Sequence, residues 1–309
     1  RIQEQKVKTF TIVFDEEEFS EAKFARMVAN KFQTDHHEFR LKPDDFLREL
    51  PVALSSLDHP SGDGPNSYTV SKITREAGIT MALSGLGGDE LFAGYPVFNR
   101  SIQLEQKKWL FQVPRSLRTA GGALYSALKK DTTAKKTAQL LGLKDGSLRN
   151  TFPLSRQVGM PDYVAALLKN NNVNADAIQR VLDHELGGRG KSLPLLSRVS
   201  VAEITTYMQN VLLRDTDQMS MAVALEVRVP FLDYKLAEYT LGISDEYKKP
   251  LIPKKLLVDS LGDLLPHEVV HRPKMGFVFP WAVWLKKELQ PLCDQHIRQL
   301  AQRDFIHGD

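Results

Sequence analysis

The sequence lacks several features that would place it in a special class of protein. It has one cysteine in 309 residues, Cys293, which excludes an intrachain disulfide and predicts a reducing, cytoplasmic location. With only 19 glycines and 16 prolines and with 42% apolar residues, it is neither collagen-like nor disordered. The best candidate for a membrane span, residues 221–232, is interrupted by Glu226, Arg228 and Pro230. The 41 basic and 38 acidic residues leave a net charge of +3, which indicates no particular class of partner.

What the sequence does have, in its first hundred residues, is an alternation of strand and helix patterns. Residues 7–14 are rich in β-branched and aromatic side chains, as a buried strand is, and an apolar stripe at helical spacing begins at Ala22. Asp15 stands where it could cap that helix. The further elements expected are strands at 37–41 and 79–83 and helices at 43–56 and 66–77. This order predicts an α/β fold with a parallel, Rossmann-like sheet.

From about residue 100 the pattern becomes helical. We therefore expect one domain over 1–309, with an α/β nucleotide-binding part at 1–100 and a mostly helical part at 101–309. Residues 107–156 carry eleven Lys or Arg against two Asp, with few aromatic residues between them. We interpret this run as a solvated helical face and expect no nucleic-acid partner.

The most informative stretch is LSGLGGDELFAGY at residues 83–95, which follows a predicted strand and opens a helix. Glycines at such a place let a ligand approach the backbone, and the free N–H groups at a helix start favour an anion. Asp89 and Glu90 make sense beside phosphates if Mg²⁺ lies between them. The alternative is a tight turn in which Asp89 only caps the helix. The local pattern leaves both readings open.

Two basic segments could also bind phosphates. Lys254 is expected to open a helix, a place that is unfavourable for a cation unless an anion binds there too. Arg272 and Lys274 flank Pro273 in a stiff loop. By contrast, Glu226, Arg228 and Asp233 lie in a stretch that otherwise reads as core, and we interpret them as a structural network of ion pairs, with binding to a ligand as the alternative.

Five segments, in order, resemble the C-terminal synthetase domain of the glutamine-hydrolysing asparagine synthetases, members of the PP-loop ATP pyrophosphatase family. The segments are TFTIVFDEEEFSEAKFA, TDHHEF, LSGLGGDELFAGY, DQMSMAVALEVRVPFLD and RPKMGFVFP. The resemblance implies an adenine-nucleotide α-hydrolase type of fold. It also implies that ATP activates the β-carboxylate of aspartate as an acyl-adenylate, and that ammonia derived from glutamine then displaces AMP.

The resemblance also assigns roles to residues at matching positions. Ile12 would pack beside the adenine, and Ser84 and Gly85 would contact the nucleotide. Asp89 would bind Mg²⁺-pyrophosphate with Glu90 close by. Lys254 would stabilise the negative charge on the phosphates, and Lys274 would assist in binding them. The implied cofactors are ATP and Mg²⁺, and the implied catalytic residues are Lys254, Asp89 and Glu90.

Three departures from the family pattern qualify these expectations. Leu86 stands where many members have Glu, and Val13 stands where a Gly is common. The pyrophosphate loop SGGxDS is absent from this sequence, and the resemblance places it just upstream, on the central strand of the sheet. We therefore expect a longer natural polypeptide with that loop and an N-terminal glutaminase domain.

Two other functions stay open at this stage. A related AMP-forming amidotransferase or cyclase could act on another carboxylate, because pocket residues set the substrate. A non-catalytic scaffold could have kept the fold and lost the loop. The sequence leaves the oligomeric state open, a homodimer included, and predicts no membrane partner.

Overall fold

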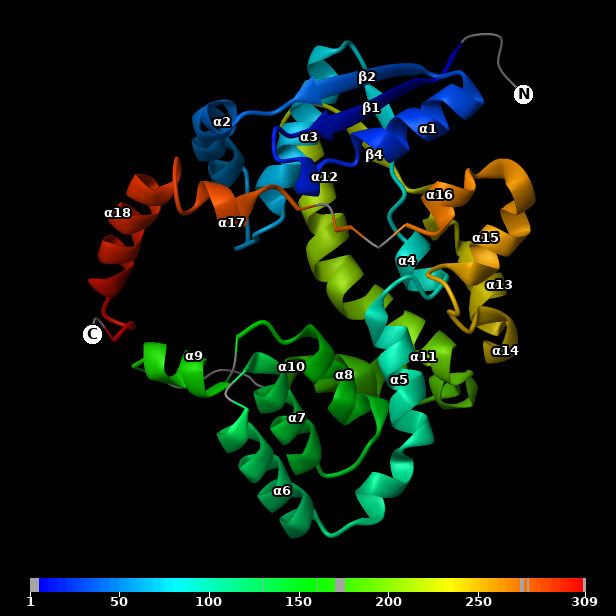
Figure 1. The fold of residues 1–309 in the computed structure, drawn as a ribbon, viewed down its shortest axis with the longest axis vertical. Helices are drawn as coiled ribbons and strands as arrows, with labels where there is room; N and C mark the ends of the chain where they lie inside the picture. The colour runs from blue at the N-terminus through cyan, green and yellow to red at the C-terminus, as the bar shows by residue number, and fades with distance from the viewer. Residues whose placement is uncertain are drawn as a thin grey trace. The chain divides into compact units, whose positions relative to one another are not determined.

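The computed structural model describes residues 6–129, 131–159, 161–169, 176–272, 275–276 and 278–307 (Figure 1). The chain divides into two compact units. The first comprises Arg1–Leu86, Val211–Pro230 and Leu257–Asp309, and the second comprises Gly87–Asn210 and Phe231–Leu256. The first unit thus takes in two segments from the part of the chain that the sequence predicts to be mostly helical.

The first unit contains the strands. β1 (Lys8–Val13) pairs with β2 (Asp35–Arg40) in parallel, with Lys8 opposite Asp35, and Figure 1 shows the two strands side by side. β3 (Met81–Leu83) pairs in parallel with β4 (Glu226–Arg228). The parallel α/β character is therefore confirmed, although the strands form two small sheets. The main helices of this unit are α1 (Ala22–Phe32), α2 (Pro43–Ser55), α3 (Gly64–Glu76), α12 (Leu213–Met221), α15 (Lys255–Leu261), α16 (His267–Val270), α17 (Trp281–Trp284) and α18 (Gln290–Ala301).

An aromatic cluster joins the end of β1 to the last part of the chain. Phe46 of α2 and Trp284 of α17 are fully buried, and both contact Phe279. Phe14 meets Phe279 edge to ring at 5.2 Å between centroids. The indole of Trp284 donates a hydrogen bond to Glu16 Oε1 at 2.8 Å, so its polar edge is satisfied as well. This packing fixes the segment that follows β1.

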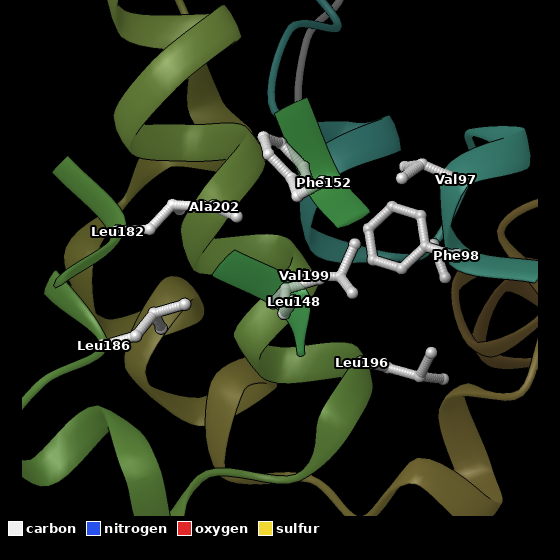
Figure 2. Close-up of a cluster of buried hydrophobic side chains, with 10 residues drawn as sticks. Val97, Phe98, Leu148, Phe152, Leu182, Leu186, Leu196, Val199 and Ala202 are labelled. Carbon is white, nitrogen blue, oxygen red and sulfur yellow. The ribbon is translucent and has the colours of Figure 1, made fainter. Parts of the chain in front are cut away.

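The second unit is helical. Its helices are α4 (Gly88–Leu91), α5 (Pro96–Gln106), α6 (Arg115–Leu128), α7 (Thr132–Gly142), α8 (Leu148–Arg156), α9 (Pro161–Leu167), α10 (Ala177–Glu185), α11 (Leu195–Glu203), α13 (Tyr234–Gly242) and α14 (Asp245–Lys248). Apolar side chains from α5, α8, α10 and α11 point toward one another in its core (Figure 2). Phe98, Val199 and Ala202 have no exposed surface there. A π-helical segment, Ile204–Leu212, continues α11.

The elements, the helix cap and the ion pairs that the sequence predicts agree with the structure to different degrees. The strand at 7–14 and the helices at 43–56 and 66–77 agree with β1, α2 and α3 to within a few residues. Asp15 does not cap α1, because a short 3₁₀ turn, Glu17–Phe19, intervenes and Glu21 takes the N-cap position. The expected ion pair between Glu226 and Arg228 forms at 2.8 Å, but more than half of each side chain is exposed, and Asp233 caps α13 instead of joining the pair.

No helix among the described residues is long and apolar enough to cross a membrane.

The three-residue strand β3 exposes the side chains of Met81 and Leu83, the latter to 69%. Large apolar side chains on a strand are normally covered. The central strand expected from the resemblance stays a prediction.

Lys248 of α14 gives the second unit a testable dependence of stability on pH. Its ammonium is buried and donates to Ser197 Oγ and to the carbonyl of Thr240, and burial lowers its pKa from 10.5 to about 8. The unfolded chain therefore keeps this proton over a pH range in which the folded chain releases it. Stability consequently rises with pH from about 8 to 10.5.

In urea unfolding, we expect wild type to gain about 2 kcal/mol between pH 7 and pH 9.5 relative to Lys248→Met. The exposed neighbour is the matched control, and Lys249→Met should follow wild type. Parallel pH profiles for wild type and Lys248→Met would contradict a buried, weakly basic amine.

Candidate active site

The glycine-rich segment enters the second unit through a close-packed turn. Gly87 has φ 89° and precedes α4, and a Cβ on it would lie 2.6 Å from Leu232 Cδ2. Gly88 is buried, and a Cβ there would contact the ring of Phe231 at 3.4 Å. Both neighbours belong to the VRVPFLD segment at 227–233. The glycines are needed here for conformation and for close packing against that segment.

Asp89 and Lys254, two residues 165 positions apart, form an ion pair in the second unit. Lys254 Nζ donates to Asp89 Oδ1 at 2.9 Å, with 34% and 27% of the two side chains exposed. A Cβ at Gly94 would lie 1.9 Å from Asp89 Oδ1, so only glycine leaves room for this carboxylate. The chain folds back there because Gly94 N donates to the carbonyl of Asp89 at 2.8 Å. The pair is therefore accessible to a ligand and tightly placed.

Lys254 is held in an unusual backbone conformation. Its φ of 59° lies in the left-handed region, which costs a non-glycine residue about 1 kcal/mol or more. It directly precedes α15, whose first residue is Lys255, so it does not open the helix as expected from the sequence. Strained residues of this kind gather at functional sites, where the surrounding structure maintains them. Here the strain accompanies the pairing with Asp89.

Glu90 has a different environment from its neighbour Asp89. Its side chain is buried, and it accepts a hydrogen bond from the hydroxyl of Tyr95 at 2.9 Å. Burial raises the pKa of Glu90, and burial with the nearby Glu90 charge raises the pKa of Tyr95. The carboxylate of Glu90 therefore lies inside the second unit. Its predicted catalytic role stays a prediction, and the contacts seen suit a residue that positions α4.

Arg156 joins Tyr95, Tyr207 and Glu203 in a polar layer that contacts Glu90 of α4. Its guanidinium pairs with Glu203, with Nε 3.0 Å from Oε1, and Glu203 is fully buried. It also stacks on Tyr95 and Tyr207, at 4.8 Å and 4.1 Å from the ring centroids. Tyr207 lies in the π-helical segment, a kind of structure that is frequent at functional sites. Charge, stacking and burial together fix the orientation of Tyr95, and thereby that of Glu90.

Three of the predicted nucleotide contacts lie in the first unit. Ser84 follows β3 and extends its pairing, because its N–H donates to the carbonyl of Arg228 at 2.8 Å. Its hydroxyl accepts from Leu86 N at 3.3 Å, which turns the chain. Gly85 is exposed, with open space where a Cβ would be. Nothing in the local packing requires a glycine there, so room for a ligand remains an explanation.

Ile12 lines a cavity of about 200 Å³ in the first unit. The walls come from β1 and the segment up to Glu21 that follows it, from Phe39 of β2, from the C-terminal half of α3 and from Gly276 and Val278, and most of the lining residues are apolar or aromatic. Such a pocket suits a flat, weakly polar ring system. The predicted place of Ile12 beside an adenine stays a prediction that this cavity supports.

The structure brings together Asp89 and Lys254 and directs Glu90 away into the core of its unit. Lys274 lies outside the described residues. The sequence analysis missed Gly94, Tyr95 and Arg156 as parts of the site. Gly94 and Tyr95 were already in the glycine-rich motif, whereas Arg156 was counted in the solvated basic run. Its pairing with Glu203, 47 positions along the chain, depends on long-range packing that no local pattern shows.

Comparisons with known proteins agree over most of the chain. A sequence model of the asparagine synthase family matches residues 1–308. Glutamine-hydrolyzing asparagine synthetase 1 of Bacillus subtilis (strain 168) is 28% identical over 312 residues, which cover 98% of this chain and 47% of that protein. Glutamine-hydrolyzing asparagine synthetase 3 of the same strain is 27% identical, over 81% of this chain and 35% of that protein. Amidase chyE of Penicillium rubens is 22% identical, over 98% and 47%. The chain spans less than half the length of these relatives.

The space beside Asp89 can be tested with glycine substitutions. Gly94→Ala should lower the free energy of unfolding by about 1–3 kcal/mol, because the new methyl group must displace the Asp89 carboxylate. Gly121→Ala is the control, since Gly121 lies exposed within α6 with nothing near its Cβ position, and it should stabilise by up to about 1 kcal/mol. Equal effects in chemical denaturation would count against the close contact at Gly94.

Two arginine–carboxylate pairs test the polar layer. Arg156→Ala removes the ion-pair partner of the buried Glu203, and we expect a loss of about 3–5 kcal/mol in stability. Arg149→Ala removes a pair with Asp183 in which about half of each side chain is exposed, and should cost less than about 1 kcal/mol. The comparison requires denaturation of both variants under one condition. A small loss in Arg156→Ala would show that the layer does not hold α4.

Proposed function

The chain belongs to the asparagine synthase family, and on that premise we propose that it carries the synthetase site of an AMP-forming amide synthetase. The substrate proposed is aspartate, and its β-carboxylate is activated by ATP. The nitrogen proposed is ammonia released from glutamine, as the names of the Bacillus subtilis relatives suggest. The chain covers 47% of the length of the first of these relatives, so its substrates and nitrogen source are proposals.

The observation that carries the proposal is the Asp89–Lys254 pair. A partly exposed ammonium held beside a carboxylate at the start of α4 offers a cation for phosphate oxygens, and the carboxylate offers an anion for a metal ion that the phosphates carry. Lys254 keeps this place despite its left-handed backbone. Such fixed charges are the main requirement of phosphate-transfer chemistry, in which positioning and electrostatic stabilisation do most of the catalysis.

The proposed reaction has two steps. An oxygen of the β-carboxylate attacks the α-phosphorus of ATP, the bond from that phosphorus to the bridging oxygen breaks, and pyrophosphate leaves with the electron pair. Ammonia then attacks the acyl carbon, and AMP leaves as its carboxyl–oxygen bond breaks and the nitrogen loses a proton. Lys254 stabilises the negative charge that gathers on the pyrophosphate. Ser84 and Gly85 bind the nucleotide, and Ile12 packs against its base.

The residues present fit a Mg²⁺ ion that arrives with the nucleotide. Among the described residues, no group of three or more His, Cys, Asp or Glu side chains is arranged to hold a metal ion. Mg²⁺ commonly needs only one or two protein carboxylates when phosphates supply other ligands, and Asp89 offers one that is partly exposed. When bound, the ion neutralises phosphate charge and orients the phosphate oxygens.

Leu86 favours keeping a second candidate, a relative that activates a different carboxylate. An apolar side chain replaces the Glu common at this position, so a polar contact or proton transfer there is lost. One relative, which matches 98% of this chain, carries the name of an amidase. Exchange of labelled pyrophosphate into ATP with another carboxylic acid, and none with aspartate, would favour this candidate over asparagine synthesis.

Lys254 variants of the full-length protein test the proposed function. In aspartate-dependent exchange of pyrophosphate into ATP, Lys254→Ala should lower kcat at least about a hundredfold, because the phosphates lose a preorganised cation. Lys254→Arg should retain more activity than Lys254→Ala, since it keeps the charge. The control Lys255→Ala, one residue further on, should stay within about threefold of wild type. Full activity in Lys254→Ala would remove the charge pair from the mechanism.

A further inference from the structure

Helix α6 of the second unit exposes a row of leucines. Figure 1 shows this helix beside α7, and most of its positions are exposed. Leu117, Leu124 and Leu128 are 64%, 64% and 77% exposed. They are seven and four positions apart, so the helical repeat places them within about 40° of one another on one face. We call these three residues the leucine stripe, and a contiguous apolar patch of this kind marks a site of interaction.

The contacts that hold α6 in place lie on a different face of the helix. Arg118 is buried, and its Nη1 donates to the carbonyls of Leu141 and Leu143 at 2.6 Å and 3.1 Å. A Cβ at Gly122 would lie 3.0 Å from Ala138 Cα, so α6 and α7 pack closely there. The leucine stripe is turned away from these contacts, and alanine would serve the helix as well. The packing of the second unit therefore does not explain why these positions are leucine.

Positive charge accompanies the leucine stripe. Eleven Lys or Arg against two Asp, with no Glu, give residues 107–156 a net charge of 11 − 2 = +9. Arg115 begins α6 and Lys129 directly follows it, and both are exposed. Lys135 of the neighbouring helix α7 is exposed as well. A surface with this charge attracts anionic partners.

Two aromatic residues add side chains that have both an apolar and a polar part. Trp109, in the 3₁₀ helix Lys108–Gln112 that precedes α6, is 57% exposed. Tyr125 directly follows Leu124 and is 37% exposed, and Lys129 Nζ lies 5.8 Å from its ring centroid. Trp and Tyr are enriched where a protein meets the boundary between lipid and water.

The combination of leucines and positive charge distinguishes between possible occupants of this face. A second copy of the chain would bring another segment of charge +9 against the first, and like charges oppose that contact. Nucleic acid would pair with the lysines, but its phosphates gain nothing from exposed leucines. An anionic lipid surface fits both features, because its headgroups attract the cations and its acyl chains take up the leucines.

We propose that α6 binds to the surface of a lipid bilayer that carries anionic headgroups, with the leucine stripe inserted between headgroups and acyl chains. Arg115 and Lys129 contact the headgroups from the two ends of the helix. A helix that lies on a membrane does not need the length of one that spans it. The proposal departs from the solvated face and the lack of a membrane partner that the sequence predicts, because composition does not show that the leucines share an exposed face. It is independent of the proposed function.

The test measures binding of the full-length protein to vesicles by flotation, using phosphatidylcholine alone or mixed with an equal part of phosphatidylglycerol. Wild type should bind the mixed vesicles, more weakly as salt is added, and should not bind the neutral ones. Leu124→Asp should weaken binding at least about tenfold, because it puts a charge where the membrane requires an apolar side chain. Leu124→Phe should bind at least as well as wild type.

Ile297→Asp is the matched control, because Ile297 of α18 is an apolar side chain with a similar exposure of 63% in the first unit. It should bind as wild type does. For the charges, Lys129→Glu should weaken binding several-fold, whereas Lys286→Glu, at an exposed lysine outside the basic segment, should not. Melting curves establish that each variant folds.

Leu124→Trp reports contact with lipid directly. After subtraction of the wild-type emission, its fluorescence should shift to shorter wavelength on the mixed vesicles and be quenched by lipids brominated on their acyl chains. Ile297→Trp should show neither effect. Failure of wild type to bind the mixed vesicles, or equal binding by Leu124→Asp, would overturn the inference. So would a wild-type dimer that Leu124→Asp dissociates, since a second copy would then cover the leucine stripe, or retention on RNA in place of binding to vesicles.

Discussion

The position of the Asp89 carboxylate is the constraint on which the rest of the candidate active site depends. Gly94 leaves the space for it, Lys254 faces it from a distant part of the chain, and α4 carries it. A one-methyl change at Gly94 and a change of backbone at Lys254 would both move it. A site that must hold charged phosphates needs this kind of fixed geometry, because charge placed in advance needs no reorganisation during the reaction.

The stability of α4 in turn comes from the layer beneath it. α4 has only four residues and could not persist alone. Glu90 anchors it to Tyr95, and Arg156 joins Tyr95 to the buried Glu203. Two consecutive carboxylates therefore have different environments: Asp89 is partly exposed and pairs with Lys254, whereas Glu90 is buried. Burying charge in this way is costly unless every partner is present, so the layer should tolerate few substitutions.

The sequence predicted what short-range patterns encode. β1, α2 and α3 follow from side-chain periodicity, and the glycine-rich turn at Gly87 follows from its composition. The pairing of β3 with β4 could not be predicted, because β4 has three residues and lies in a charged stretch. The contacts of Arg156 and Asp215 likewise join residues far apart in sequence, and local patterns carry no information about such distances.

The central claim is that the site activates a carboxylate by joining it to the α-phosphate of ATP. Aspartate labelled with ¹⁸O in its β-carboxylate tests this most directly, using the full-length protein with ATP, Mg²⁺ and ammonia. Because the attacking oxygen stays on the phosphorus when ammonia releases AMP, mass spectrometry should find one ¹⁸O in AMP for each asparagine formed. Unlabelled ADP together with ¹⁸O-labelled inorganic phosphate would contradict the account, because it would show attack on the γ-phosphorus.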